Sequence, residues 1–311
     1  MFAYLFSTVN IRELGSQLAH ARWEWVVLSL SLGPFGVWTR GRRWWYLFPA
    51  GSNPPGLVPA TMIGYMANNV LPLRAGEFVR VYVVARRWGH GFWTALATLI
   101  VERLLDSFVI VLVIVVLILR IPVPRTLEIG AVVLLAIDVV AVTVLGALAV
   151  APAAAGRVVG RLTARWPAVQ RRADDIVRTF ARGLEGVRTP GHLLPLFLWT
   201  VIVWIAPAAA AWTMFRALHL DLPWIAGWAV LAFVGLGIAI PSAPGYVGVF
   251  HAAATLALTM FGVPTTAAFG YALLFHATQI VPVTLVGWIV LLREHVSLTD
   301  ASHARPAPAS D

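Results

Sequence analysis

The sequence predicts an all-α protein, a polytopic membrane helix bundle with two broken or re-entrant helical hairpins of opposite orientation. Hydrophobic residues make up 59% of the 311 residues and charged residues only 12%, whereas soluble domains are about half apolar and about a quarter charged. Several apolar stretches approach or exceed the roughly 20 residues that a membrane-spanning helix needs. Two of these stretches are broken by Pro, Gly or Asn. Composition, segment length and breaks therefore favour a membrane bundle with interrupted helices.

Polar sequences between the apolar stretches set the expected order of helices. The first span covers about residues 21–38 and is expected to end at Arg40, Arg42 and Arg43. The segment at 57–71 is too short to cross a bilayer comfortably. Residues 1–10 look like the end of a hydrophobic helix rather than a cleavable signal peptide. The remaining apolar stretches are 92–119, 128–150, 193–215, 224–240, 246–261 and 265–292.

A basic segment at 157–190 sets the expected orientation. Basic loops stay in the cytoplasm, so this segment is predicted to be a cytoplasmic helical loop that binds anionic lipid headgroups. Residues 1–296 are expected to form a single integral-membrane domain in the cell inner (cytoplasmic) membrane. The polar, Ala/Pro-rich residues 297–311 are expected to form a disordered tail.

The arginine positions require each broken segment to begin and end on one side of the membrane. Arginines lie before and after residues 57–82, and if both groups are cytoplasmic, this segment enters and leaves from the cytoplasmic face. By the same argument residues 224–261 enter from the opposite face, with residues 241–248 at the tip. Such irregular backbone persists at membrane depth only where it lines a cavity or is covered by protein. Two ordinary spans with kinks are the alternative.

The first break carries residues suited to bind phosphate. Pro72 stops the helix, and the two asparagines before it can satisfy the backbone groups that are freed. The two arginines after it present planar donor groups that match phosphate oxygens, and the glutamate between them can pair with either. As an alternative, these pairs only close the hairpin. The candidate substrate-binding residues here are Asn68, Asn69, Arg74, Glu77 and Arg80.

The next helix places charged residues within an apolar segment. Glu102 and Asp106 are four residues apart and share a helix face, and Arg103 lies three residues before Asp106. Ionisable residues at this depth are costly and usually face a protected interior. They are candidates for a polar lining that grips an anionic group, and a self-neutralising cluster that joins helices is the alternative.

The second break offers backbone donors rather than charges. A half-helix is expected to start near Gly245, with free N–H groups that suit an anion. His251 could titrate near neutral pH, although a lone His in an apolar helix more often packs and hydrogen-bonds. The candidates here are Pro244, Gly245, Gly248 and His251, followed by the weaker candidates Asp138, His276 and Gln279.

On these residues the chain resembles a known family, the flippase-like transmembrane domain of lysylphosphatidylglycerol synthases and related stand-alone membrane proteins. The motifs are Asn69-x-x-Pro72-x-Arg74-x-Gly76-Glu77-x-x-Arg80, Glu102-Arg103-x-x-Asp106 and Pro244-Gly245-x-x-Gly248, and they cover about residues 20–295. The family usually has a second Gly where this chain has Tyr246, and often an acid where it has His251. The resemblance implies a bundle that moves a lipid headgroup, an aminoacyl phospholipid or a polyprenyl-linked glycolipid, between leaflets.

These observations predict a flippase-like lipid transporter. No motif for ATP, metal or dinucleotide binding is present in the sequence, so we expect no cofactor and no nucleic-acid partner. The expected partners are membrane lipids with anionic headgroups and a lipid-modifying enzyme or glycosyltransferase. Two alternatives stay open: an integral-membrane enzyme that acts on a lipid-linked substrate with the acids as general acid and base, and a non-transporting accessory subunit.

Overall fold

The computed structural model of the protein describes residues 11–52, 54–89, 91–162, 165–239 and 243–294. Every regular element within these ranges is a helix. The first half contains α2 (Ile11–Ala19), α3 (Trp23–Trp45), α4 (Leu57–Val70), η1 (Pro72–Arg74), α5 (Gly76–Trp88), α6 (Phe92–Ile118) and α7 (Arg125–Val150). The second half contains α8 (Pro152–Leu162), α9 (Pro167–Gly183), α10 (Glu185–Arg188), α11 (Pro190–Ala217), α12 (Trp224–Ala239), η2 (Pro244–Tyr246), α13 (Val249–Thr259) and α14 (Thr265–Arg293).

The long helices identify a multi-pass membrane protein. Among the described residues, three helices are both long and apolar enough to cross a membrane, namely α7, α11 and α14. The helix α6, with 27 residues, is about as long as these three but carries Glu102, Arg103 and Asp106 in its middle. At about 1.5 Å per residue it extends roughly 40 Å, enough to span a bilayer. The predicted polytopic helix bundle is confirmed.

Two units of four helices make up the bundle, and α7–α10 connect them. Each unit consists of a long helix, a hairpin of two short helices and a second long helix: α3–α6 in the first and α11–α14 in the second. The helix α3 packs along α11, α4 packs against α14, and α12 packs against α6. Each hairpin therefore lies against the last helix of the other unit.

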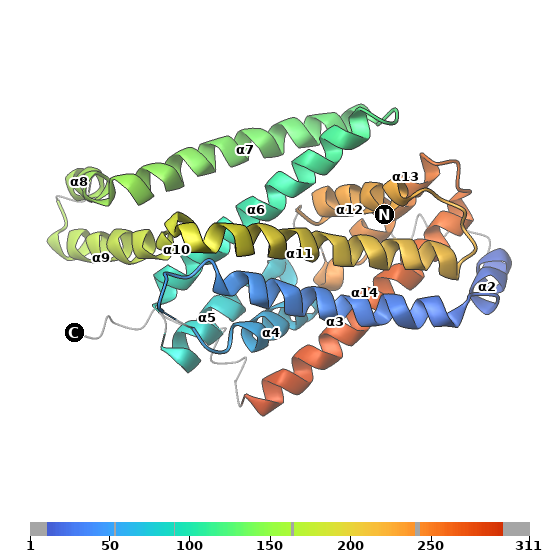
Figure 1. Ribbon diagram of the computed structural model, residues 1–311, viewed down its shortest axis with the longest axis horizontal. Coiled ribbons are helices and arrows are strands. Elements are labelled where there is room, and N and C mark those ends of the chain that lie inside the picture. Colours follow the sequence, from blue (N-terminus) through green and yellow to red (C-terminus); the bar gives the residue numbers. More distant parts are fainter. Residues whose placement is uncertain (1–10, 53, 90, 163–164, 240–242, 295–311) are drawn as a thin grey trace.

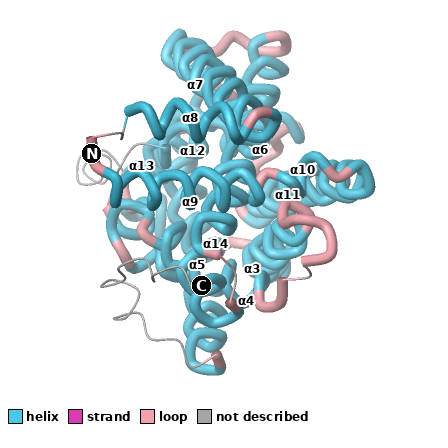
Figure 2. The backbone as a smooth tube through the Cα atoms, turned by 90° about the vertical axis from the view of Figure 1, so that its left-hand side faces the viewer, coloured by secondary structure: helices cyan, strands magenta, loops and turns pink. Residues whose placement is uncertain are grey.

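The two hairpins point in opposite directions. Figure 1 shows α4 and α5 toward the end of the bundle that carries α9 and α10, and α12 and α13 toward the opposite end. Viewed from the first of these ends, α8 and α9 lie across the bundle in front of the other helices (Figure 2). The opposite orientation of two hairpins agrees with the sequence analysis, and their entry into a bilayer stays a prediction.

The hairpin tips share one local conformation. Both η1 and η2 begin with proline and then contain two successive residues in the left-handed region: Leu73 (φ 58°) and Arg74 (φ 56°), and Gly245 (φ 64°) and Tyr246 (φ 60°). In each case a glycine, Gly76 or Gly248, comes four residues after the proline. This local repeat relates the two units at the residue level, which the apolar pattern of the chain does not reveal. Left-handed Leu, Arg and Tyr are strained, and such strain concentrates at functional sites.

Two expected helix boundaries were wrong. The helix α3 does not end at the arginines but continues to Trp45, so Arg40 and Arg43 lie inside it. The helix continues past them because both arginines pair with acidic side chains on α6. In the second hairpin the half-helix begins at Val249 and not near Gly245. Residues 1–10, 240–242 and 297–311, which include part of the expected second tip and the expected tail, lie outside the described residues.

Candidate functional site

A compact group of charged residues lies where α3, η1, α5 and α6 meet. Its acids come from α5 and α6, and its arginines come from all four elements. We call this group the charge cluster, and its members are Arg40, Arg43, Arg74, Glu77, Arg80, Glu102, Arg103 and Asp106. All six charged residues that the sequence analysis selected in this region are therefore brought together.

Each carboxylate of the cluster contacts three guanidinium groups. Asp106 lies 2.6 Å from Arg40, 2.8 Å from Arg43 and 3.2 Å from Arg103. Glu102 contacts Arg43, Arg80 and Arg103, and Glu77 contacts Arg74, Arg80 and Arg103. Arg103 thus touches all three acids and forms the centre of the network.

Positive charge exceeds negative charge in the cluster. Within the described part of the chain, five guanidiniums face three carboxylates, a formal excess of two positive charges. An uncompensated charge inside an apolar bundle is costly, so such groups normally find a partner of opposite sign. An anion beside the cluster would compensate this excess, while the ion pairs themselves join α3, α5 and α6.

The cluster has a buried half and an open edge. The side chains of Arg43, Arg80 and Glu102 are 0–1% exposed. Arg80 also lies 4.8 Å from the centre of the Trp44 ring, a cation–π contact that fixes it against α3. By contrast, the side chains of Arg74 and Arg103 are 31% and 29% exposed. An approaching ligand can reach the open edge without breaking the buried pairs.

Close backbone contact makes this geometry possible. Gly76, the first residue of α5, packs against the backbone of Gly64 and Asn68 on α4. A Cβ at position 76 would lie 2.6 Å from the Asn68 backbone nitrogen, far too close. Glycine at this position allows the two helices of the first hairpin to touch, as small residues do in membrane helix pairs. The hairpin in turn holds Glu77 and Arg80 opposite α6.

The tips of the two hairpins meet beside the cluster. Arg74 donates to the carbonyl oxygen of Ile238 at the end of α12, at 3.5 Å. Asn69 donates through its amide to the hydroxyl of Thr284 on α14, at 2.8 Å. Gly245 lies against the Asn69 carbonyl, and a Cβ at Gly245 would be 3.3 Å from that oxygen, a tight contact. Pro244 and Gly245 thus sit next to the first hairpin, while Asn68 is buried in α4.

The histidines belong to the second hairpin and not to the charge cluster. The Gly248 N–H donates to His251 Nδ1 at 3.3 Å, so the side chain satisfies a free donor at the start of α13. His276 bonds through Nε2 to the Gly245 carbonyl at 2.8 Å, and the two imidazole rings lie 4.6 Å apart. This arrangement favours the packing interpretation of His251. Asp138 is buried in α7, outside the charge cluster.

Three contributors to the site were missed in the sequence. Arg40 and Arg43 were assigned to a helix end, although two arginines three residues apart share a helix face when the helix continues. Trp204 on α11 donates through Nε1 to Asp106 at 3.3 Å, and it is otherwise one of many aromatic residues in an apolar segment. Only the two arginines had a signal in the sequence. An uninterrupted aromatic run follows Arg43 and indicates that the helix continues beyond it.

One comparison with known proteins matches. The family model described as the lysylphosphatidylglycerol synthase TM region matches residues 1–287. No curated protein and no solved structure matches the chain.

Proposed function

Because the chain belongs to the lysylphosphatidylglycerol synthase TM region family, we propose that it is a flippase-like lipid transporter of the cytoplasmic membrane. It moves a phosphate-bearing headgroup between the two leaflets. The observation that carries this proposal is the excess of two positive charges in the charge cluster. A phosphate placed at the open edge supplies the missing negative charge.

Arg74 and Arg103 are the residues that hold the phosphate. Both side chains are about one-third exposed, and their guanidinium groups can donate to phosphate oxygens in a bidentate manner. Arg80, which also seemed suited to this role from the sequence, is buried and forms ion pairs with Glu77 and Glu102. It keeps the site in shape instead. Glu77 balances the charge of the open edge when no lipid is bound.

The sign of the excess charge also selects among headgroups. An aminoacyl phospholipid brings amino groups that add positive charge to a site that already has too much. A polyprenyl-linked phosphate or another anionic headgroup neutralises it. We therefore propose an anionic lipid, and the polyprenyl-linked glycolipid fits better than the aminoacyl phospholipid.

A transporter fits this arrangement better than the alternative of an enzyme. Each acid of the cluster already contacts three guanidiniums, which leaves it poorly placed to exchange a proton with a substrate. The two are distinguished by incubating the protein in vesicles with an anionic lipid, and then measuring both the leaflet accessibility of the lipid and its mass by mass spectrometry. We expect an altered leaflet distribution with unchanged lipid masses, and a new lipid mass would instead establish the enzyme.

Arg74→Gln should slow leaflet exchange without unfolding the protein. We expect the exchange rate to fall about 10- to 150-fold, since a hydrogen bond to a charged group contributes about 1.5–3 kcal/mol. Stability should change little because Arg74 has one acidic partner, at 3.6 Å, and is partly exposed. The measurement is the leaflet exchange of a fluorescent phosphatidylglycerol in vesicles that contain the purified variant.

Arg125→Gln is the matched control for this experiment. Arg125 is an exposed arginine at the start of α7, away from the charge cluster. Its replacement removes the same charge and should leave exchange unchanged. Wild-type exchange equal to that of empty vesicles across anionic, zwitterionic and cationic headgroups would refute the proposed transport.

A further inference from the structure

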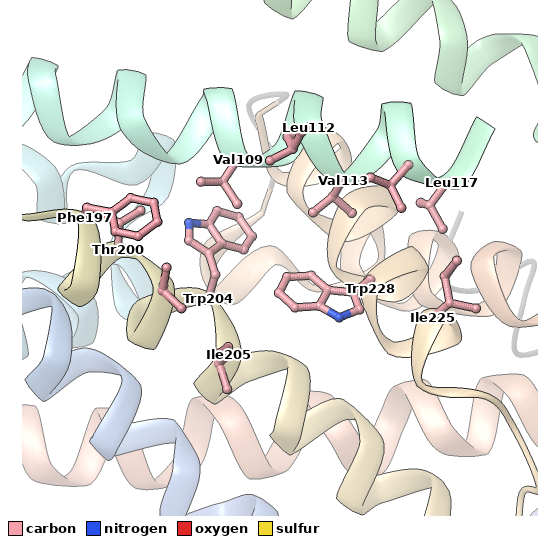
Figure 3. A pocket seen from close by; sticks show the side chains of 12 residues that line it. Val109, Leu112, Val113, Leu117, Phe197, Thr200, Trp204, Ile205, Ile225 and Trp228 are labelled. Atoms are coloured by element: carbon pink, nitrogen blue, oxygen red, sulfur yellow. The ribbon is translucent and has the colours of Figure 1, made fainter. Parts of the chain in front are cut away.

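An apolar pocket lies between α6, α11 and α12. It has a volume of about 490 Å³, within the range of ligand sites. Figure 3 shows Val109, Leu112, Val113 and Leu117 of α6 on one side and Trp204 of α11 reaching toward them from the other. On α6 the lining runs from residue 109 to residue 117, about 12 Å at 1.5 Å per residue.

Trp204 joins this pocket to the charge cluster. Its ring forms part of the pocket wall. Its Nε1 donates to Asp106 at 3.3 Å, and the guanidinium of Arg40 lies 6.0 Å from the ring centre. The indole therefore separates the apolar pocket from the charge cluster, and it contacts two members of the cluster, Asp106 and Arg40. Amphipathic tryptophan suits such a boundary.

The lining is almost entirely apolar. Its one hydroxyl, from Thr200, already donates to the Leu196 carbonyl at 2.7 Å. The rim is open toward the surroundings of the bundle, since Leu112 is 62% and Phe197 64% exposed. In a membrane protein those surroundings are hydrocarbon, so a lipid chain can enter sideways from the bilayer.

We infer that this pocket binds one hydrocarbon chain of the same lipid whose phosphate lies at the open edge of the charge cluster. This inference rests on the proposed function and adds to it that the protein recognises the lipid at two places. The charged edge selects the headgroup, and the pocket holds the chain while Trp204 marks the junction between them.

The position of the pocket also gives the lipid a direction. The helix α6 begins beside α9, where the Thr94 hydroxyl donates to the Thr179 carbonyl at 3.1 Å, and Asp106 precedes the pocket residues along it. A lipid with its phosphate at the cluster and a chain in the pocket thus has its headgroup toward the α9 end. Lipids of the leaflet at that end have this orientation. A lipid bound in this way would enter from the leaflet on the α9 side, which the arginine distribution predicts to be cytoplasmic.

Photo-crosslinking tests the pocket directly. The probe is phosphatidylglycerol with a diazirine in one acyl chain, mixed into vesicles that contain the wild-type protein, and labelled peptides are identified by mass spectrometry. We expect peptides with Val113, Trp204 and Trp228 to be labelled several-fold more than the exposed face of α7. Equal labelling of both would mean that only bulk lipid contacts the pocket, and the inference would be wrong.

Two matched substitutions sharpen the result. Val113→Trp fills the pocket and should abolish the excess labelling, whereas Val140→Trp makes the same change on the exposed face of α7 and should preserve it. If Val113→Trp does not fold, the wild-type labelling pattern still decides. A photoreactive amino acid placed at position 113 gives a second readout: protein–protein crosslinks there without lipid labelling would show that a second copy covers the pocket and would also overturn the inference.

Labelling and leaflet exchange can fail separately. Excess labelling in the pocket with exchange no faster than in empty vesicles would refute the transporter and support the chain-binding pocket. The opposite result is fast leaflet exchange that Val113→Trp leaves unchanged, with equal labelling of the pocket and of the exposed face of α7. That result would refute the pocket and support the transporter.

Discussion

Glu102→Gln should reduce the free energy of unfolding by about 3–5 kcal/mol, the usual cost of removing one partner from a buried ion pair. The Glu102 side chain is fully buried and contacts Arg43, Arg80 and Arg103. Its neutralisation leaves five guanidiniums facing two carboxylates, so the excess positive charge rises from two to three. The two fully buried arginines cannot move to solvent to relieve it. Equilibrium unfolding in mixed micelles of a mild detergent and dodecyl sulfate measures the loss.

Glu24→Gln provides the control for this loss. Glu24 also pairs with an arginine, Arg22, at 2.9 Å, but both side chains are largely exposed. Exposed pairs contribute about 0–1 kcal/mol, so this variant should unfold almost like the wild type. Equal stability of the two variants would contradict the buried network described above. An anionic lipid should stabilise Glu102→Gln more than the wild type, since it compensates a larger excess charge.

The helical architecture was largely predictable because apolar length carries most of the information about a membrane bundle. The expected spans at 92–119, 193–215 and 265–292 agree with α6, α11 and α14 to within a few residues. The first break was predictable as well, since Pro72 follows two asparagines and arginine placement limits the topology. Proline alone was not enough, because α3, α11 and α14 each continue through an internal proline. The end of α3 was not, because the arginines that look like a helix end pair with acids more than fifty residues later in the chain.

The candidate site was predictable in its members and not in their roles. The sequence showed which charges lie within apolar segments, because every such charge is conspicuous against its neighbours. It did not show that Arg80 is enclosed by Glu77, Glu102 and Trp44 while Arg103 reaches the open edge. Both are arginines at similar depth, and only packing separates them. The net charge of the cluster depended on Arg40 and Arg43, so the excess became visible only in three dimensions.

Gly76→Ala should damage the first hairpin more than any other single-methyl change near the site. The added Cβ would meet the backbone of Gly64 and Asn68, and these atoms cannot rotate away as a side chain can. Overpacking of this kind lowers the free energy of unfolding by about 1–3 kcal/mol. We expect a loss of about 3 kcal/mol here, because the opposing atoms are rigid backbone. The helices α4 and α5 must move apart, which carries Glu77 and Arg80 away from α6. We therefore expect lower stability in the unfolding assay and slower leaflet exchange in the folded fraction.

Gly146→Ala separates this effect from the general effect of alanine in a helix. Gly146 lies within α7, and a Cβ there would meet no described atom within 4 Å. Alanine favours the helix by up to about 1 kcal/mol over glycine, so this variant should be as stable as the wild type or more stable. If Gly76→Ala behaved in the same way, α4 and α5 would not be in close contact in the membrane. The first hairpin would then have a different shape, and the charge cluster could not form from α3, α5 and α6 as described, because α5 positions two of its members through that contact.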